Sequence, residues 1–561
     1  MSRYVSDAVV DLLQELGVKY LPLNPGASFR GLHDSVVNRE DGPEIILCTH
    51  EEIAVAAAHA YAKAVGEVGF AVVHDLVGLM HASMAVYDAW CDRTPMVVLG
   101  GGGPADAGER RPVDWFHSAN TQSALVRPFV KWDDDPITAT ATLDAIARAY
   151  NIAGSAPHGP TYVTMDTSVM EAKYSGADVS VRPPRHNPPF VAADPEIEAA
   201  ARLLLEATFP VIVAGDVGLD ERSTPLLTAL MEALGAPGRD ERNLSAIPTN
   251  HPLSFSGDDW VLDQADIILA VDVHDIRYLL ARTTNPPPVL DVSTRSLALR
   301  SWANADHVGA PQVTSLVSDP ILGLEALLAK IENIREGHGN AGKEKRLEEL
   351  RARQESLQSE RSKTLSDRWD NHPVFIHRLV SEVYEAVKQL PWLLLLRNTR
   401  SWTEGIWQFD RAGRYLGHSG GGGMGYGPGA LIGGGLAARD RGEFAVGIIG
   451  DGDFMYAPGA IWTAVHHRIP MLVVVNNNRT YLNDEEHQAQ VARTRGRPVE
   501  NAPIGVSIDD PAIDFAALAR SQGAWGHGPV EDPGELTDVL KQAVEQVHGG
   551  AVAVVDVHTA K

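Results

Sequence analysis

The chain has 561 residues, of which 44% are hydrophobic and 22% charged, and its formal net charge is −25. This length predicts roughly three or four globular domains. The acidic balance argues against a nucleic-acid backbone or an anionic membrane surface as the partner. The sequence has no apolar run of about eighteen residues, so we expect no membrane span. Its two cysteines, Cys48 and Cys91, favour a reducing cytoplasm over a disulfide framework.

Strand-like runs alternate with helical patterns along the first third of the chain. The segment up to Val18 has the apolar stripe of an amphipathic helix and lacks the pattern of a signal peptide. Alternation of this kind predicts a parallel sheet covered by helices. The expected strands are Lys19–Leu23, Ile45–Cys48, Phe70–Val73, Met96–Leu99 and Thr161–Met165, and two of the expected helices are Ile53–Val65 and His81–Trp90.

A proline-rich stretch, Pro183 to Pro189, predicts a linker, and a second α/β unit follows it. The segment from Arg335 to Asp370 is dense in charged residues and contains no proline, which predicts a solvated connecting helix. A third α/β unit begins at about His372. The expected strands of these two units are Val211–Ala214, Ile267–Val271, Trp392–Leu396, Phe444–Ile449, Met471–Val475 and Ala551–Val557.

These patterns predict a fold of three consecutive α/β domains, each built on a parallel sheet. The expected domain ranges are 1–182, 190–334 and 372–561, with a helical linker at 335–371. The first and third domains are similar in size and layout, which hints at an old duplication.

Polar residues follow two neighbouring strands of the third unit. Gly450-Asp451-Gly452-Asp453 comes after the first strand, and three asparagines, Asn476 to Asn478, come after the second. Open parallel sheets bind ligands at the carboxyl ends of their strands, and glycines let the backbone approach a phosphate closely. Asp451 and Asn478 offer the hard oxygen ligands that Mg²⁺ prefers. Their separation of 27 residues (478 − 451) is the length of one helix plus one strand.

This stretch resembles the GDG…NN thiamine diphosphate motif of the benzoylformate decarboxylase and acetolactate synthase superfamily. The resemblance implies thiamine diphosphate and Mg²⁺ as cofactors, with the metal held by Asp451, Asn478 and the backbone carbonyl of Thr480. A third asparagine leaves the register of the family's pair open by one residue. Asp453 stands where Ser or Ala is more usual in the family, and it brings a carboxylate near the diphosphate. The residues expected against the cofactor in this stretch are Gly450, Asp451, Gly452, Asp453, Asn478 and Tyr481.

A glycine-rich loop, His418 to Gly427, precedes a small-residue helix expected at Ala430–Ala438. In the family, a bulky apolar residue of this loop supports the bent cofactor, and the preceding carbonyl holds its aminopyrimidine. Met424 and Gly422 match those two positions. The alternative is that Met424 is an ordinary core residue.

An acidic pair, Glu51-Glu52, stands between an expected strand and a small-residue helix. The segment resembles the family's HE(Q/A)xAxxxAxGYAxxxG pattern, whose first Glu activates the cofactor. Glu51 therefore takes that role by resemblance, and such an acid needs an apolar surrounding to raise its proton affinity. A helix-capping role is the alternative for Glu51, and Glu52 is expected to be a helix N-terminal acid.

Three histidines are candidates for proton transfer. His74 follows the strand Phe70–Val73 and falls on the active-site His of benzoylformate decarboxylase; a His at the end of a strand suits acid–base work near neutral pH. His81 is expected to lie against the core. His117 is either a second substrate-facing group or merely exposed. The segment Asn24–Ser28 resembles the family's NPG(S) turn, but Ala27 occupies the position of the active-site Ser, which puts an aryl-2-oxoacid substrate in doubt.

The resemblance covers nearly the whole chain and implies pyrimidine-binding, middle and diphosphate-binding domains in that order. In such enzymes the site lies between the first domain of one subunit and the third domain of another, so we expect a homo-oligomer, with a dimer as the minimum and a tetramer as the expected state. The polar segment after Tyr481 carries three arginines that offer a place for a carboxylate or phosphate, and a solvated face is the alternative. These are Arg493, Arg495 and Arg497.

The expected function is that of a lyase or carboligase acting on a 2-oxoacid or a related small carbonyl compound, decarboxylase-like. The alternatives are an acetolactate synthase-type carboligase, a 2-hydroxyacyl-CoA lyase or oxalyl-CoA decarboxylase, a flavin-dependent relative of pyruvate oxidase, and an inactive cofactor-binding regulatory subunit. A basic groove of nucleotide size in the middle domain would favour the CoA-dependent alternative.

Overall fold

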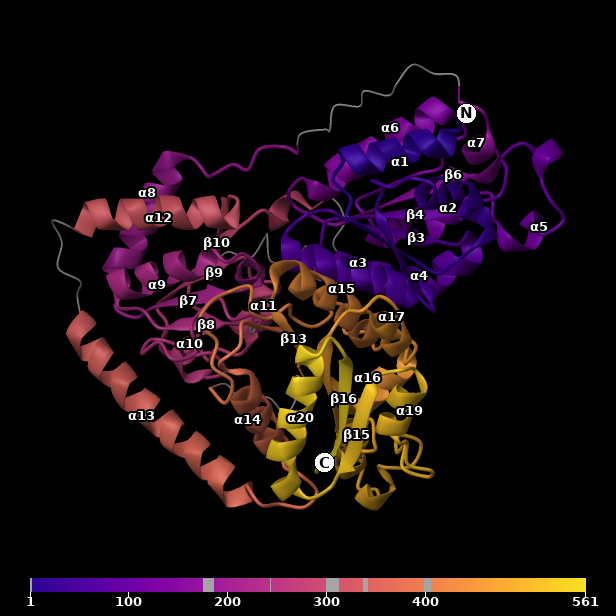
Figure 1. Ribbon diagram of the computed structural model, residues 1–561. Coiled ribbons are helices and arrows are strands. Elements are labelled where there is room, and N and C mark those ends of the chain that lie inside the picture. The colour runs from indigo at the N-terminus through magenta and orange to yellow at the C-terminus, as the bar shows by residue number, and fades with distance from the viewer. Residues whose placement is uncertain (1–2, 175–185, 243, 299–311, 336–341, 398–404) are drawn as a thin grey trace. The chain divides into compact units, whose positions relative to one another are not determined.

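The computed structural model describes residues 3–174, 186–242, 244–298, 312–335, 342–397 and 405–561 (Figure 1). Its strands form three sheets, all of them parallel, which confirms the expected fold class. The chain divides into two compact units. Residues Met1–His186, Asp370–Trp402 and His418–Lys561 form the first unit, and Asn187–Trp369 with Thr403–Gly417 form the second. No helix among the described residues is long and apolar enough to cross a membrane.

The N-terminal sheet of the first unit has six strands in the order β2-β1-β3-β4-β6-β5. The strands expected from the sequence are confirmed to within a few residues. β5 was not expected, because Trp-Asp-Asp is short and polar. The strands are β1 Tyr20–Leu23, β2 Glu44–Leu47, β3 Gly69–Val73, β4 Met96–Gly102, β5 Trp132–Asp134 and β6 Pro160–Asp166. The helices are α1 Val5–Glu15, α2 Arg30–Val37, α3 Glu51–Val65, α4 Leu76–Cys91, α5 Asp114–His117, α6 Ala139–Gly154 and α7 Thr167–Glu171.

The C-terminal sheet of the same unit has five strands in the order β12-β13-β14-β16-β15. Its central strands are buried along most of their length, as their continuous apolar runs predict. The sequence pattern did not predict β15, because its sequence Trp-Gly-His-Gly-Pro-Val contains Gly and Pro, which are uncommon inside strands. The strands are β12 Trp392–Leu396, β13 Phe444–Gly450, β14 Met471–Asn477, β15 Trp525–Val530 and β16 Val552–His558. The helices are α14 Ile376–Val387, α15 Tyr426–Arg441, α16 Asp451–Tyr456, α17 Ala460–His466, α18 Leu482–Thr494, α19 Phe515–Ser521 and α20 Leu536–His548.

The second unit holds a five-stranded sheet in the order β11-β10-β9-β7-β8. The charged segment is confirmed as a long helix, although it is not wholly solvated, because Arg346 is buried and donates to the carbonyls of Leu234 and Gly235 at 2.7 and 2.8 Å. Part of the proline-rich stretch, 183–185, lies outside the described residues. The strands are β7 Pro210–Ala214, β8 Gly238–Asp240, β9 Ile267–Val271, β10 Val289–Ser293 and β11 Val313–Val317. The helices are α8 Asp194–Glu206, α9 Ser223–Leu234, α10 Trp260–Gln264, α11 Ile276–Ala281, α12 Pro320–Arg335 and α13 Lys343–Arg368.

Helices α3 and α15 pack side by side within the first unit (Figure 1). Small residues bring their backbones together: a Cβ at Gly433 would lie 2.0 Å from the carbonyl oxygen of Ala57, and a Cβ at Gly429 would lie 2.5 Å from the Cβ of Ala56 and 3.0 Å from the carbonyl oxygen of Ile53. Any larger residue at Gly433 would therefore push the helices apart. This contact links the N-terminal sheet to the C-terminal sheet.

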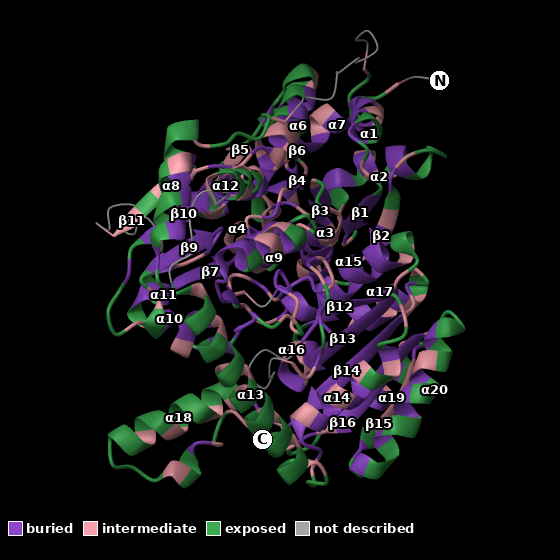
Figure 2. Ribbon diagram, turned by 90° about the vertical axis from the view of Figure 1, so that its left-hand side faces the viewer, coloured by how far each residue is buried: buried purple, intermediate pink, exposed green. Residues whose placement is uncertain are grey.

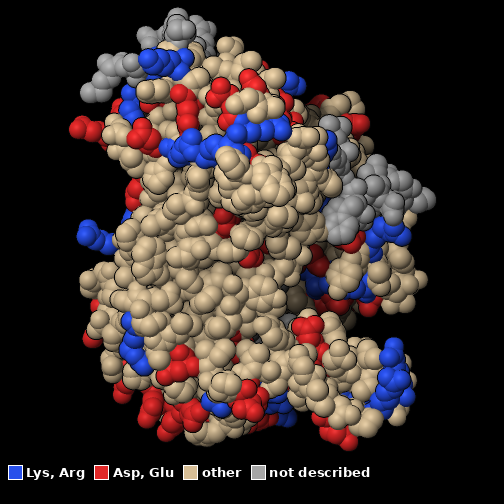
Figure 3. All heavy atoms as spheres, turned by 90° about the vertical axis from the view of Figure 1, so that its right-hand side faces the viewer, with Lys and Arg blue, Asp and Glu red and all other residues tan. Residues whose placement is uncertain are grey.

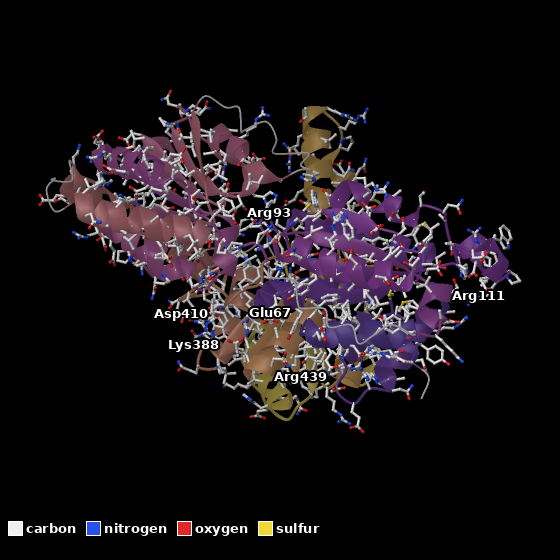
Figure 4. All side chains as sticks on the ribbon, turned by 90° about the horizontal axis from the view of Figure 1, so that it is seen from above. Glu67, Arg93, Arg111, Lys388, Asp410 and Arg439 are labelled. Atoms are coloured by element: carbon white, nitrogen blue, oxygen red, sulfur yellow. The ribbon has the colours of Figure 1, made fainter. Side chains whose placement is uncertain are left out.

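Polar contacts at the end of α15 reinforce the same junction. Arg439, labelled in Figure 4, donates to the hydroxyl of Tyr20 at 2.9 Å and to the carbonyl of His467 at 3.0 Å. The ring of His467 in turn accepts a hydrogen bond from the backbone N–H of Leu47, with 2.7 Å between the nitrogen atoms. Burial, and then the positive charges of His466 and Arg439, lower the pKa of His467 to about 4. The junction therefore requires this imidazole to be neutral, because a protonated Nε2 cannot accept a hydrogen bond.

We expect the free energy of unfolding to fall as the pH decreases from 6.5, the ordinary pKa of His, to about 4. In that window the unfolded chain binds a proton at His467 that the folded chain excludes. His467→Gln keeps an acceptor for Leu47 and does not titrate. As the pH falls through this window, the free energy of unfolding of the variant should therefore decrease less than that of the wild type, by on the order of 1 kcal/mol after allowance for the partly exposed ring. Urea unfolding between pH 4 and 7 measures the difference. The control is His487→Gln, an exposed His on α18; equal slopes for the wild type and His467→Gln would contradict the assignment.

Candidate active site

A pocket of about 480 Å³ opens at the carboxyl ends of β12, β13 and β14. Every described residue that lines it comes from the C-terminal part of the first unit. The lining residues are Leu396, Arg397, His418, Ser419, Gly422, Gly423, Met424, Tyr426, Gly427, Ile448, Ile449, Gly450, Asp451, Gly452, Asp453, Asn478, Thr480, Tyr481, Leu482, Asn483 and Asp484. The Gly-Asp-Gly-Asp stretch, the glycine-rich loop and the residues after β14 thus meet at one place.

Asp451 is the first residue of α16 and is 3% exposed. Its two carboxylate oxygens accept hydrogen bonds from the backbone N–H groups of Gly452 at 2.7 Å and Arg479 at 2.6 Å. Burial nevertheless raises the pKa of Asp451 to about 6, against the lowering effect of these N–H groups. A buried carboxylate is costly in its charged form, so a bound metal ion would be stabilising here.

The three asparagines have different partners. Asn476 accepts a hydrogen bond from the hydroxyl of Thr559 at 2.6 Å, and Asn477 donates to Asp556 at 2.9 Å. Asn478 alone of the three lines the pocket, and its side-chain oxygen accepts from the backbone N–H of Thr480 at 3.1 Å. The first two side chains therefore tie β14 to β16, which leaves Asn478 in the register facing Asp451.

Met424 and Tyr481 converge on Gly452. A Cβ at Gly452 would lie 2.5 Å from the ring of Tyr481 and 3.3 Å from the terminal methyl of Met424. Met424 is only half-buried and lines the pocket, so it is not an ordinary core residue. Gly422, with φ of 67°, takes a left-handed conformation two residues earlier, and a Cβ there would meet no atom within 4 Å. The glycine at this position serves the turn rather than a close contact.

Asp453 is turned toward the N-terminus of α15. Its carboxylate accepts a hydrogen bond from the backbone N–H of Gly425 at 2.7 Å, and burial raises its pKa to about 6. Glu52 reaches the same point, because a Cβ at Gly425 would lie 2.2 Å from its carboxylate. Burial, and then the charge of Asp453, raise the pKa of Glu52. The two acids thus meet at a helix N-terminus, where negative charge is favourable.

Glu51 begins α3 and is 4% exposed. Its carboxylate lies 3.2 Å from Nδ1 of His81, and the ring of His81 stacks on that of His50 with centroids 4.8 Å apart. The expectation that His81 lies against the core is wrong, because its side chain is 57% exposed. A Cβ at Gly78 would lie 2.9 Å from a Glu51 oxygen. Glu51 therefore sits in a tightly packed wall formed by α3 and α4.

His74 lies in a second cluster of the N-terminal domain. Its Nδ1 is 2.8 Å from the hydroxyl of Ser28 and accepts the backbone N–H of Asp75 at 2.8 Å. An N–H group can only donate, so the neutral ring carries its proton on Nε2. A carboxylate oxygen of Asp75 also lies 2.9 Å from Nδ1. Ser28 and Asp75 thus hold the ring at Nδ1, which leaves Nε2 as the nitrogen that carries the proton.

His117 packs against His74, with ring centroids 5.5 Å apart. It ends the short helix α5, which an ion pair of 2.7 Å between Arg111 and Asp114 stabilises; Arg111 is labelled in Figure 4.

The arginines after Tyr481 are not among the residues that line the pocket. Arg493 lies on α18, which has no buried residue and appears green and pink in Figure 2. A solvated face is the interpretation that fits this helix.

The predicted site residues thus form two groups, of which one lines the pocket described above. Glu51, His74 and His117 belong to the N-terminal domain, and the others belong to the pocket. Sequence reasoning missed Ser28 as the partner of His74, although the serine stands one residue beyond the expected position. It also missed Leu396 and Arg397, and the available signal was their place at the carboxyl end of β12.

Comparison with protein families identifies two segments of the chain. Residues 3–124 match the model of the thiamine pyrophosphate enzyme N-terminal TPP binding domain, and residues 398–557 match that of the C-terminal TPP binding domain. A benzoylformate decarboxylase of Pseudomonas aeruginosa is 26% identical and the match covers 97% of each chain. The large subunit of acetolactate synthase isozyme 3 of Escherichia coli is also 26% identical, over 98% of this chain and 94% of that protein.

Solved structures share the fold over the full length. A thiamine diphosphate-dependent 4-hydroxybenzoylformate decarboxylase of Rhodococcus jostii superposes with a TM-score of 0.78 at 21% identity, covering 99% of both chains. A benzoylformate decarboxylase of Polynucleobacter necessarius gives 0.78 at 19% identity, covering 100% of this chain and 99% of that one.

The asparagine assignments lead to opposite expectations for two neighbouring substitutions. Asn478→Ala should weaken Mg²⁺-dependent binding of thiamine diphosphate by roughly tenfold or more with little change in melting temperature. Asn477→Ala removes the amide donor of the buried Asp556 and should cost about 1–3 kcal/mol of stability while the folded protein still binds the cofactor. Titration calorimetry and thermal unfolding separate the two effects. The assignment of Asn478 to the cofactor site would be wrong if Asn477→Ala lost thiamine diphosphate binding and Asn478→Ala retained it.

Proposed function

This chain belongs to the thiamine pyrophosphate enzymes, and from that premise we propose that it is a thiamine diphosphate- and Mg²⁺-dependent lyase that cleaves the bond next to the carbonyl of a 2-oxoacid. The observation that carries the proposal is the pocket in which Asp451, Asn478 and the Thr480 backbone come together. We assign the diphosphate-binding role to residues 372–561 and the pyrimidine-binding role to residues 1–182.

The donor set of the pocket fits the proposed cofactors. One carboxylate, one amide oxygen and one backbone carbonyl are ligands that suit Mg²⁺ together with diphosphate oxygens. Asp451, Asn478 and Thr480 would hold the metal, and Gly450 and Gly452 would lie along the diphosphate. Met424 and the carbonyl of Gly422 would support the two rings.

Glu51 is the residue we assign to cofactor activation. The bound cofactor supplies a carbanion and an electron sink for the bond that breaks. Glu51 would hold a proton at its carboxyl group and share it with the pyrimidine, and its 4% exposure supports that role. Exclusion of water around the site would favour loss of CO₂, because the reaction neutralises charge.

His74 is the residue we assign to proton transfer toward the substrate. The Asp75 N–H and the Ser28 hydroxyl at Nδ1 leave Nε2 as the group that exchanges the proton. Ser28 thus takes part through His74, although the preceding Ala27 occupies the family's serine position. His117 would line the same region from α5.

Glu51 is not among the residues that line the pocket, which supports a homo-oligomer in which a second copy completes each site. On the face drawn in Figure 3, charged side chains gather toward the upper and lower ends and leave the middle largely free of them. Depletion of charge is typical of the core of a protein interface. We therefore propose a dimer as the minimum unit and a tetramer as the assembled state.

The middle sheet gives little support to the CoA-dependent alternative. Two arginines at its carboxyl edge are engaged by acids of the same unit: Arg239 pairs with Glu241 at 3.0 Å and with Asp259 at 2.9 Å, and Arg282 also pairs with Glu241. A nucleotide would have to compete with these carboxylates. An acetolactate synthase-type carboligation stays the second candidate, because a relative of that name matches over nearly the whole chain.

The decisive experiment combines cofactor binding with a CO₂-release screen over 2-oxoacids. We expect Mg²⁺-dependent binding by the wild type and by Glu51→Gln, with release reduced roughly 10²-fold or more in the variant because the activating proton is lost. Glu67→Gln is the matched control; this exposed acid follows the other end of α3 and is labelled in Figure 4.

Two outcomes would change the proposal in different ways. Binding without CO₂ release from any 2-oxoacid would move the assignment to carboligation or to acyl-CoA cleavage. Failure of the wild type to bind thiamine diphosphate in the presence of Mg²⁺ would overturn the proposed function altogether.

A further inference from the structure

Three glycines of the glycine-rich loop approach α4 and its C-terminal end closely. A Cβ at Gly420 would lie 2.3 Å from a carboxylate oxygen of Asp92, and one at Gly421 would lie 2.5 Å from a carboxylate oxygen of Asp88. A Cβ at Gly423 would lie 2.1 Å from the terminal methyl of Met84. None of these glycines has a positive φ. Their lack of a side chain therefore serves the close approach of the loop to α4.

Asp88 fastens both ends of this stretch. It is 1% exposed and accepts hydrogen bonds from the hydroxyl of Ser419 and from the backbone N–H of Gly423. Between these two residues the chain makes a turn in which Gly422 N–H donates to the carbonyl of Ser419 at 3.2 Å. One carboxyl group of α4 thus bridges the turn that carries Gly422.

A second anchor lies next to the first. The ammonium group of Lys63 on α3 contacts Asp92 at 2.7 Å and donates to the carbonyl of His418 at 3.2 Å. His59 also lies 3.1 Å from Asp92, and all three side chains are buried. Burial raises the pKa of Asp88 to about 7. The hydrogen bond from the Ser419 hydroxyl opposes this rise, and the negative charge of Asp92 adds to it. Buried charged networks are costly to disturb, so they hold a single loop geometry.

We propose that Asp88 is a positioning residue of the cofactor site, which fastens the stretch from Ser419 to Gly423 to α4 and thereby fixes Gly422 and Met424 before the cofactor binds. This inference rests on the proposed function. A loop that is already ordered loses less conformational entropy on binding. Release of the loop therefore weakens cofactor binding without removing any atom that contacts the cofactor.

The test uses Asp88→Ala in the full-length protein, with two readouts. In the cofactor-free protein, amide hydrogen exchange at residues 419–423 should become faster than in the wild type, while exchange in β13 and β14 stays unchanged. By calorimetry, the dissociation constant of thiamine diphosphate with Mg²⁺ should rise roughly tenfold or more. Asp88→Asn, which resembles the neutral acid and keeps an acceptor oxygen, should restore most of the affinity and of the protection.

Two further variants keep the inference falsifiable. Ser419→Ala removes one anchor and decides the question if Asp88→Ala does not fold; it should show the same two effects more weakly. Ser83→Ala is the control, because this hydroxyl of α4 donates to the exposed carbonyl of Met80 at 2.8 Å and not to the loop at 419–423. Unchanged exchange at 419–423 in the anchor variants would overturn the inference. Wild-type protein that fails to bind the cofactor would instead overturn the proposed function, and the exchange readout would still decide the role of Asp88.

Discussion

The contact between the backbones of α3 and α15 is the constraint on which the rest of the first unit depends. The carbonyl oxygen of Ala57 on α3 lies 2.0 Å from where a Cβ of Gly433 would be. Because the backbones of the two helices come this close at Gly433, the N-terminus of α3, with Glu51 and Glu52, is held at a fixed place relative to the N-terminus of α15. The glycine-rich loop ends there, so its geometry follows from helix packing as much as from its own sequence.

Buried carboxyl groups recur along this construction, each with a different compensation. Among the described residues, Asp451 accepts from backbone N–H groups, Asp453 accepts from the N-terminus of α15, and Asp88 accepts from a hydroxyl and a backbone N–H. Burial raises the pKa of each of the three. A folded domain tolerates such groups only where their cost is offset. Asp453 and Asp88 are offset by contacts that hold the glycine-rich loop, whereas Asp451, which lines the pocket together with Asn478, is the one that we assign to a cation.

Much of this arrangement was predictable from the sequence, for identifiable physical reasons. Long apolar runs such as Met471–Val475 and the spacing of Asp451 and Asn478 predicted the strands and the pocket, because both depend on local periodicity. The orientation of individual side chains did not follow. His81 was expected in the core, since its neighbours on α4 are apolar, yet it faces outward beside Glu51. The contact of Asp88 with the glycine-rich loop could not be predicted from the sequence either, because its partner Ser419 lies 331 residues away.

Asp453 and Glu52 both reach Gly425, the N-cap of α15. They lie far apart in sequence but act on one helix end. In any hybrid built by exchanging segments with a relative, residues 52 and 453 therefore belong to the same exchangeable module. A crossover placed between them would separate two acids that meet at one helix end in this chain.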